Sequence, residues 1–154
     1  MSRRIAVALV LALIASTAPS ALGARSDAAA FQARGGAICA ELVRTVGTLP
    51  PPNTRAELPG YLERVAGLFS RARRRVAGLS APRPLRARLR LAVVAQAAAD
   101  RQLTVVARTL RRGANPGAAP AFPRLAKMRV YRRFERLNTA ANRRWRLAGL
   151  TACA

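Results

Sequence analysis

The chain has 154 residues and carries 28 Lys and Arg against 6 Asp and Glu, so its formal net charge is +22. It has no His, which excludes catalytic dyads and triads built on imidazole and removes the commonest metal ligand. Hydrophobic residues make up 51% of the chain but aromatic residues only 5%, and few are β-branched, which disfavours β-structure. The length favours one domain, and the composition predicts an all-α fold.

The first residues have the three-part pattern of a secretory signal peptide. Arg3 and Arg4 form a short positive region and residues 5–15 are uniformly apolar. Ala21 and Gly23 supply the small side chains that are typical of the −3 and −1 positions of a cleavage site before Ala24. The alternative is an uncleaved membrane anchor, although the apolar run is shorter than the about 20 residues that a spanning helix needs. The predicted organisation is a signal peptide, residues 1–23, and a basic helical-bundle domain, residues 24–154.

The apolar pattern predicts a first helix from about Asp27 to Thr48. Its apolar positions recur at spacings that place them on one helical face, and they are Phe31, Ile38, Leu42, Val46 and Leu49. Gly35 and Gly36 weaken the first half of this helix by about 1 kcal/mol each relative to Ala. The prolines at positions 50–52 end it, because proline lacks the amide donor.

The second predicted helix begins at Thr54, because Thr54 and Glu57 have the spacing of a capping box. A regular apolar stripe follows, formed by Leu58, Leu62, Val65, Phe69, Ala72, Val76 and Leu79. Pro59 conflicts with this start, because it would fall beyond the first turn. Either the helix kinks there or it begins at Pro59. Pro82 and Pro84 end the segment.

The third predicted helix runs from Pro84, a residue favoured at the first helical position, to about Arg112. Its inward stripe contains both apolar and polar side chains, namely Leu85, Leu89, Ala92, Gln96, Ala99, Leu103, Val106 and Leu110. A loop rich in Gly and Pro follows over residues 113–120.

The fourth predicted helix starts at Ala121 or Pro123 and ends at Ala148, with Gly149 suited to the position after the helix. Its inward positions are Leu125, Met128, Phe134, Leu137, Ala141 and Ala148, with Tyr131 and Trp145 at the flanks. Four amphipathic helices with short connections predict an antiparallel four-helix bundle, up-down-up-down. An intermolecular coiled coil is the alternative, but Pro and Gly interrupt each stripe.

Cys39 and Cys153 are the two cysteines of the chain. Export would place them in an oxidising compartment, where such a pair usually forms a disulfide. A bridge would close a loop of over 100 residues and contribute about 4 to 5 kcal/mol in the chain-entropy model. The alternative is two free thiols or intermolecular bridges. Redox or nucleophilic cysteine chemistry is excluded, because the chain has neither a Cys-x-x-Cys motif nor a His.

The acidic residues have structural interpretations. Asp27 suits the positive end of the first helix dipole, and two others have the spacing of helical ion pairs, which are Glu41 with Arg44 and Glu135 with Arg132. Asp100 stands among alanines, and an exposed position is favoured for it because Asp is seldom buried. If it were buried, it would be the best candidate for a catalytic acid. Without a carboxylate cluster or His, the sequence predicts no metal, no cofactor and no enzymatic activity.

Two groups of arginines flank the predicted turn between the second and third helices. They are Arg71, Arg73, Arg74, Arg75, Arg83, Arg86, Arg88 and Arg90. An antiparallel turn would bring the two groups together at one end of the bundle. Because guanidinium groups form bidentate contacts with phosphate and carboxylate, these residues are a candidate anion-binding site. The alternative is that they form the solvated faces of basic helices, because no groove-reading motif or aromatic platform accompanies them.

Several short motifs together resemble small secreted, uncharacterised helical proteins of GC-rich actinobacteria. They are Ala37-Ile38-Cys39, the turn at residues 49–52, residues 54–58 with Tyr61-Leu62, the turn at Ala81-Pro82, and the ending Ala148-Gly149-Leu150-Thr-Ala-Cys153. The resemblance covers most of the chain after the leader. It implies a helical bundle outside the cytoplasm in which the two cysteines pair, and it assigns no activity. Pro59-Gly60 departs from the pattern.

The sequence therefore predicts an exported, non-enzymatic bundle that binds anionic polymers or a lipid surface at the cell envelope. Two alternatives stay open, which are a basic nucleic-acid-binding protein whose leader is misassigned and a bundle anchored by an uncleaved leader. The sequence points to no small-molecule substrate and leaves the oligomeric state open.

Overall fold

The computed structural model describes residues 21–113 and 122–154, which form helices and short connections without any strand. Residues 1–20 of the predicted leader (residues 1–23), residues 114–120 of the predicted loop (residues 113–120) and Ala121 lie outside the described residues. The helical segments are α1 (Ala21–Gly47), α2 (Leu58–Ala77), the 3-10 turn η1 (Arg83–Leu85), α3 (Arg86–Arg112), α4 (Phe122–Lys127), α5 (Arg129–Leu147) and the 3-10 turn η2 (Thr151–Cys153).

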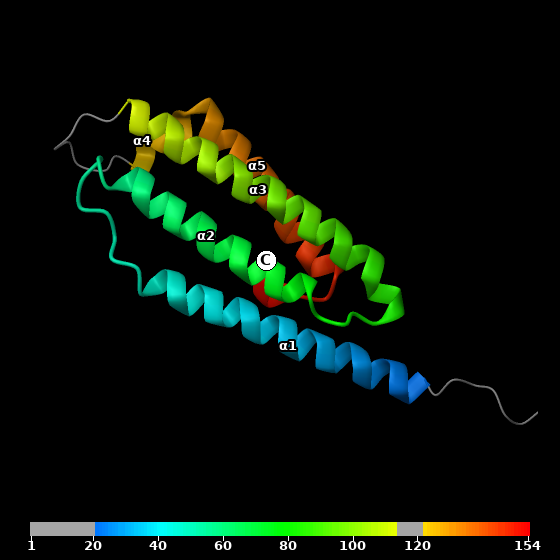
Figure 1. The fold of residues 1–154 in the computed structure, drawn as a ribbon. Helices are drawn as coiled ribbons and strands as arrows, with labels where there is room; N and C mark the ends of the chain where they lie inside the picture. Colours follow the sequence, from blue (N-terminus) through cyan, green and yellow to red (C-terminus); the bar gives the residue numbers. More distant parts are fainter. Residues whose placement is uncertain (1–20, 114–121) are drawn as a thin grey trace, which may run out of the picture.

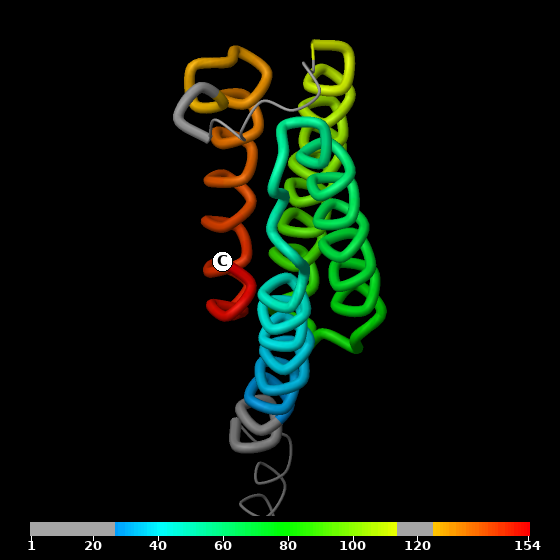
Figure 2. The backbone as a smooth tube through the Cα atoms, turned by 90° about the vertical axis from the view of Figure 1, so that its left-hand side faces the viewer, coloured from blue at the N-terminus to red at the C-terminus, as the bar shows by residue number. Residues whose placement is uncertain are grey.

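The four long helices α1, α2, α3 and α5 run alternately in opposite directions (Figure 1). Helix α3 packs against both α2 and α5, whereas α1 packs against α2 and the C-terminal turn η2. The view turned by 90° shows α1 lying along α2, with α5 on the other side of the bundle (Figure 2). The predicted all-α, up-down-up-down bundle is confirmed.

The start of α2 differs from the predicted one. The Thr54 hydroxyl accepts a hydrogen bond from the Glu57 amide at 3.3 Å, and the Glu57 carboxylate accepts one from the Asn53 amide at 2.8 Å. These bonds form a turn ahead of the helix, which begins at Leu58. Pro59 then falls in the first helical turn, where its missing amide has no partner to lose. The predicted start at Thr54 is wrong, and a start beside Pro59 is correct.

The fourth predicted helix is not continuous. Met128 adopts an extended conformation with ψ of 131°, and this break separates α4 from α5. The break lets Leu125 of α4 pack into a cluster with Leu58, Val106 and Leu110 at the far end of α2 and α3. Burial of the Leu125 side chain in this cluster favours the broken arrangement.

The remaining boundaries differ less from those predicted. Helix α1 begins at Ala21 instead of Asp27 and ends at Gly47. The third segment opens with the 3-10 turn η1 and becomes α-helical at Arg86 instead of Pro84. None of the described helices has the length and apolarity needed to cross a membrane.

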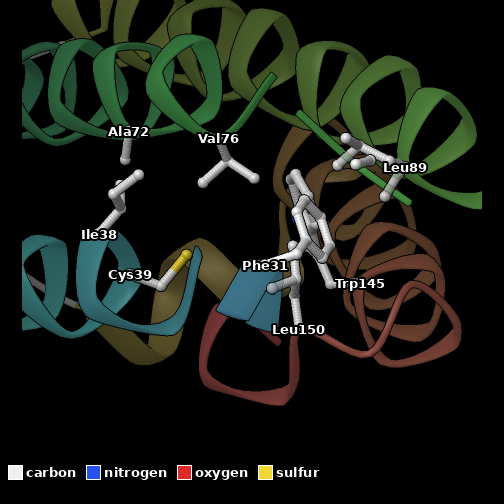
Figure 3. Packing of buried hydrophobic residues seen from close by; sticks show 10 residues of the cluster. Phe31, Ile38, Cys39, Ala72, Val76, Leu89, Trp145 and Leu150 are labelled. Atoms are coloured by element: carbon white, nitrogen blue, oxygen red, sulfur yellow. The ribbon is translucent and has the colours of Figure 1, made fainter. Parts of the chain in front are cut away.

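One part of the core joins α1 to the C-terminal segment. Figure 3 shows Ile38 of α1 facing Ala72 of α2, and Phe31, Trp145 and Leu150 gathered together beside them. Trp145 is only 3% exposed, so it is a central core residue and lies further inside than the predicted position at the flank of the inward face. This cluster fixes the C-terminal turn against the first helix.

Two glycines permit this contact. Gly149 has a φ of +77° and ends α5, because the Leu150 amide donates to the Trp145 carbonyl and the Gly149 amide to the Arg146 carbonyl. This confirms the predicted helix end. Gly35 of α1 lies so close to Leu150 that an added Cβ would stand 2.5 Å from its Cδ2. The glycine that weakens α1 locally thus makes room for the chain that packs on it.

Candidate functional site

The eight arginines of the candidate site flank the connection between α2 and α3. Four lie in the last two turns of α2, and the others lie in η1 and the first turns of α3. Successive helical residues are rotated by about 100°, so the arginines of α2 spread over three directions. Arg71 and Arg74 are exposed on the outer face, Arg73 faces α3, and Arg75 faces α1.

Five of these eight side chains have a specific partner within the bundle. Arg73 binds Asp100, Arg75 binds Glu41, Arg74 donates to Ser70 Oγ at 2.9 Å, and Arg86 donates to the Ala81 carbonyl at 3.0 Å. Arg88 donates to the Leu147 carbonyl at 3.4 Å. For Arg71, Arg83 and Arg90 the described residues supply no such bond. The set is therefore one region of the surface in which only some of the guanidinium groups are available to an external anion.

Asp100 is buried, which corrects the expectation that it is exposed. Asp100 has only 7% of its surface exposed to solvent. Oδ2 accepts a hydrogen bond from Nε of Arg73 at 3.0 Å, and Oδ1 accepts one from Nε2 of Gln96 at 2.9 Å. Burial is tolerated because an arginine and an amide replace the water that the carboxylate loses.

The same network continues into α5. The Oε1 atom of Gln96 accepts a hydrogen bond from the Trp145 indole at 3.0 Å, while Arg73 also donates to Ser70 Oγ at 3.1 Å. One chain of side chains thus runs from α5 through α3 to α2. Among the described residues no buried side-chain polar atom lacks a hydrogen-bond partner. Both carboxylate oxygens of Asp100 are occupied by structural partners, so the geometry does not present it as a catalytic acid.

Glu41 lies next to a different arginine from the one predicted. Its carboxylate is 2.8 Å from Nη1 of Arg75 on α2, and the hydrogen bond and charge of Arg75 lower the pKa of Glu41 below its ordinary 4.5. The charge of Arg44, the predicted partner, contributes least to this shift in the pKa. The ion pair therefore joins α1 to α2 instead of bracing α1 alone.

Two further carboxylates, one on α2 and one on α5, differ in their partners. Glu63 of α2 pairs with Arg111 of α3 at 2.6 Å. The described residues show no ion pair between Glu135 and Arg132. Burial and, to a smaller extent, the charge of Glu135 raise the pKa of the Tyr131 phenol above its ordinary 10.0.

Cys39 and Cys153 form a disulfide between α1 and η2, with Cα atoms 5.1 Å apart and 114 residues apart in sequence. This confirms the predicted intramolecular pair. Structural disulfides of this kind form and persist in oxidising compartments. The bridge forms one wall of a groove of about 290 Å³ between α1 and α5, lined also by Leu42, Val43 and Phe69.

The described residues hold no group of three or more acidic or Cys side chains placed to bind a metal ion. Comparison with known proteins finds no family model, curated protein or solved structure that matches the chain. The resemblance to secreted actinobacterial proteins stays a prediction.

Proposed function

We propose that this is an exported, non-enzymatic helical-bundle protein that binds anionic polymers or surfaces at the cell envelope. The observation that carries the proposal is the imbalance of charge at the surface. In the described part of the chain three carboxylates, Asp100, Glu41 and Glu63, pair with arginines, and a fourth, Glu57, binds a backbone amide. Few carboxylates are left to balance the basic side chains, so the positive electrostatic field at the surface of the protein attracts anions.

Two features support export. The leader pattern over residues 1–23 is that of a signal peptide, and the Cys39–Cys153 bridge suits an oxidising compartment. The intact mass of the protein from its host, measured without and with a reductant, tests this part. We expect the mass of a chain that begins at Ala24, and we expect this mass to rise by that of about two hydrogens on reduction. A full-length, reduced mass from the cytoplasmic fraction would overturn export and favour a nucleic-acid-binding protein.

Retention on a dextran sulfate resin tests the binding part. Arginine contacts with an anionic polymer release counterions, so the protein should be retained at low salt and elute as the salt rises. A protein that passes through at low salt, or whose retention does not weaken with salt, would contradict the proposal.

A matched pair of variants tests the candidate site. Each carries four Arg→Gln changes at exposed positions, so both lose the same charge. The site variant changes Arg71, Arg74, Arg83 and Arg90, and the control changes Arg34, Arg64, Arg112 and Arg129. We expect the site variant to elute at distinctly lower salt than the control. Equal elution of the two would show that net charge alone binds the polymer and would remove the site assignment.

A further inference from the structure

The outward face of α3 carries apolar side chains that are exposed in the part of the chain that the structure describes. Leu91, Val94 and Val105 are 52%, 65% and 39% exposed. Because a helix turns by about 100° per residue, these three positions fall within an arc of about 60°. Core residues of α3 such as Ala99 and Leu103 lie on the other side of the helix. The three residues therefore form an apolar stripe along the solvent side of α3.

A row of arginines borders this stripe. Arg90, Arg101 and Arg108 are exposed and, by the same helical geometry, lie within about 20° of one another beside the apolar arc. Arg101 and Arg108 also line a shallow groove of about 460 Å³ between α2 and α3. Three arginines thus lie along the border of α3 toward α2, although Glu63 and Asp100 also line the groove.

The border toward α5 continues the same pattern. The hydrogen bond from Arg88 to the Leu147 carbonyl places the end of α5 beside the start of α3. Leu147 is 49% exposed, and Arg144, one turn earlier in α5, is exposed too. One exposed apolar and one exposed basic side chain thus lie in the last turn of α5, which adjoins the start of α3.

This face carries no negative charge from α3. Asp100 is the one acidic residue of the helix, and it is buried, with Arg73 and Gln96 occupying its carboxylate. The exposed surface of α3 thus carries aliphatic side chains and arginines but no acidic side chain of its own.

We propose that this face of α3 is a membrane-contact surface that lies flat on a bilayer rich in anionic lipid. Leu91, Val94 and Val105 would enter the boundary of the acyl chains, and the arginines beside them would lie at the level of the lipid phosphates. A helix in the membrane plane needs this combination of an apolar stripe and cationic borders. The inference rests on the proposed function and names the anionic surface.

The same chemistry argues against two other occupants. A second copy of the chain would bring two rows of arginines together with no carboxylate from α3 between them, which is repulsive. A polynucleotide would satisfy the arginines through its phosphates but would leave the aliphatic stripe without an apolar partner. A lipid surface matches both parts.

Co-sedimentation with vesicles tests the proposal. The full chain, with its disulfide intact, is mixed with vesicles of phosphatidylcholine alone or with added phosphatidylglycerol. We expect binding to the anionic vesicles and much weaker binding to the neutral ones. The variant Leu91→Ser/Val94→Ser should bind the anionic vesicles at least about tenfold more weakly, because each apolar side chain contributes a severalfold gain on entering the interface. Val43→Ser on α1, where the valine is 66% exposed, is the matched control and should bind as the wild type does.

Parallel elution from dextran sulfate separates the two proposals. The Leu91→Ser/Val94→Ser variant keeps every charge, so its elution and its thermal unfolding should match the wild type. Vesicle binding equal to that of the wild type would overturn the membrane-contact surface while the proposed function stands. Retention of the wild type on the resin without binding to anionic vesicles, or equal binding to both kinds of vesicle, would overturn it too. A wild-type dimer that the double change converts to a monomer would assign the face to a second copy. Failure of the wild type on both resin and vesicles would overturn the proposed function itself.

Discussion

The buried hydrogen-bonded chain through Trp145, Gln96, Asp100 and Arg73 links residues of three different helices. A shift of one of these helices along its axis would separate buried donors from their acceptors in this network. Such a loss costs about 1 to 3 kcal/mol for each neutral group and more for a charged one. At this scale the network specifies the register between α2, α3 and α5 in a core in which several central positions are alanines.

The first prediction concerns this network. Asp100→Ala should lower the free energy of unfolding by about 3 kcal/mol, because it leaves the largely buried Arg73 guanidinium without its carboxylate. Removing both charges in Arg73→Met/Asp100→Leu should restore much of that loss. The control is Glu63→Gln at an exposed ion pair, expected to cost less than about 1 kcal/mol. Urea unfolding measures all three, and similar losses for Asp100→Ala and Glu63→Gln would contradict the prediction.

A second prediction concerns the left-handed residue at the end of α5. Gly149→Ala should destabilise the protein by about 1 to 2 kcal/mol, because a side chain is strained at a φ of +77°. Its Cβ would also collide with the side chain of Gln32. Gly47→Ala is the matched control, because nothing lies within 4 Å of a Cβ there. Thermal unfolding compares the two, and an equal effect would contradict the assigned role of Gly149.

The ion pair between α1 and α2 gives a pH prediction. Because Arg75 lowers the pKa of Glu41 in the folded state, the pair stabilises the protein fully above the ordinary pKa of 4.5, and this contribution is lost as the pH falls through the lowered value. An NMR titration of the Glu41 carboxyl should show its pKa rising in Arg75→Gln. Arg71→Gln removes the same charge from the outer face of α2 and should leave the pKa almost unchanged. Equal shifts would assign the effect to the general positive field.

At the scale of elements, the sequence predicted the long helices because their signals are local. Pro50 to Pro52 separate α1 from α2, and the apolar stripes identify the buried faces of α2 and α3. The break at Met128 could not be predicted, since no Gly or Pro marks it and its cause is the packing of Leu125 against distant residues. The predicted start of α2 was too early. Thr54 and Glu57 do accept hydrogen bonds from backbone amides, but they do so in a turn that precedes the helix.

A fourth prediction belongs to the junction of α1 with η2. The Cys39–Cys153 bridge joins residues 114 positions apart, so Cys39→Ser/Cys153→Ser should lower the free energy of unfolding by about 4 to 5 kcal/mol in the chain-entropy model. Hydrogen exchange should show the largest loss of protection in α1, because among the described elements α1 packs mainly on α2 and η2. Adding a reductant to the wild type should reproduce both effects, and uniform loss of protection over all helices would contradict this localisation.

At the scale of the whole molecule, the sign of the surface charge could be predicted from the sequence, but its distribution could not. The predicted arginine groups do flank one connection, yet Arg73 and Arg75 turn toward carboxylates on neighbouring helices. Composition could not show this, because it depends on which helices adjoin. The apolar stripe on α3 was not predicted, although Leu91 and Val94 lie outside the predicted inward stripe of this helix. Their exposure to solvent is a property of the folded bundle.

A fifth prediction follows from the net charge of +22. Repulsion among the arginines destabilises the compact state, and salt screens it. Raising the salt from about 10 mM to about 150 mM should therefore raise Tm, by about 2 to 4 °C if screening contributes about 1 kcal/mol. The variant Arg71→Gln/Arg74→Gln/Arg83→Gln/Arg90→Gln should respond less. An uncharged osmolyte at equal osmolality is the control, and an equal rise in Tm with it would contradict the electrostatic cause.

The bridge between α1 and η2 also has a consequence in time. A ribosome adds about 5 to 20 residues per second, so the 114 residues that separate Cys39 from Cys153 take roughly 6 to 23 s to make. During that interval Cys39 has no partner in its own chain. If the pair is oxidised during synthesis, the Cys39 thiol stays without its bridge until nearly the whole domain has been synthesised. The bridge therefore forms after the helices between the two cysteines have been synthesised. The contacts among those helices can form before the bridge does.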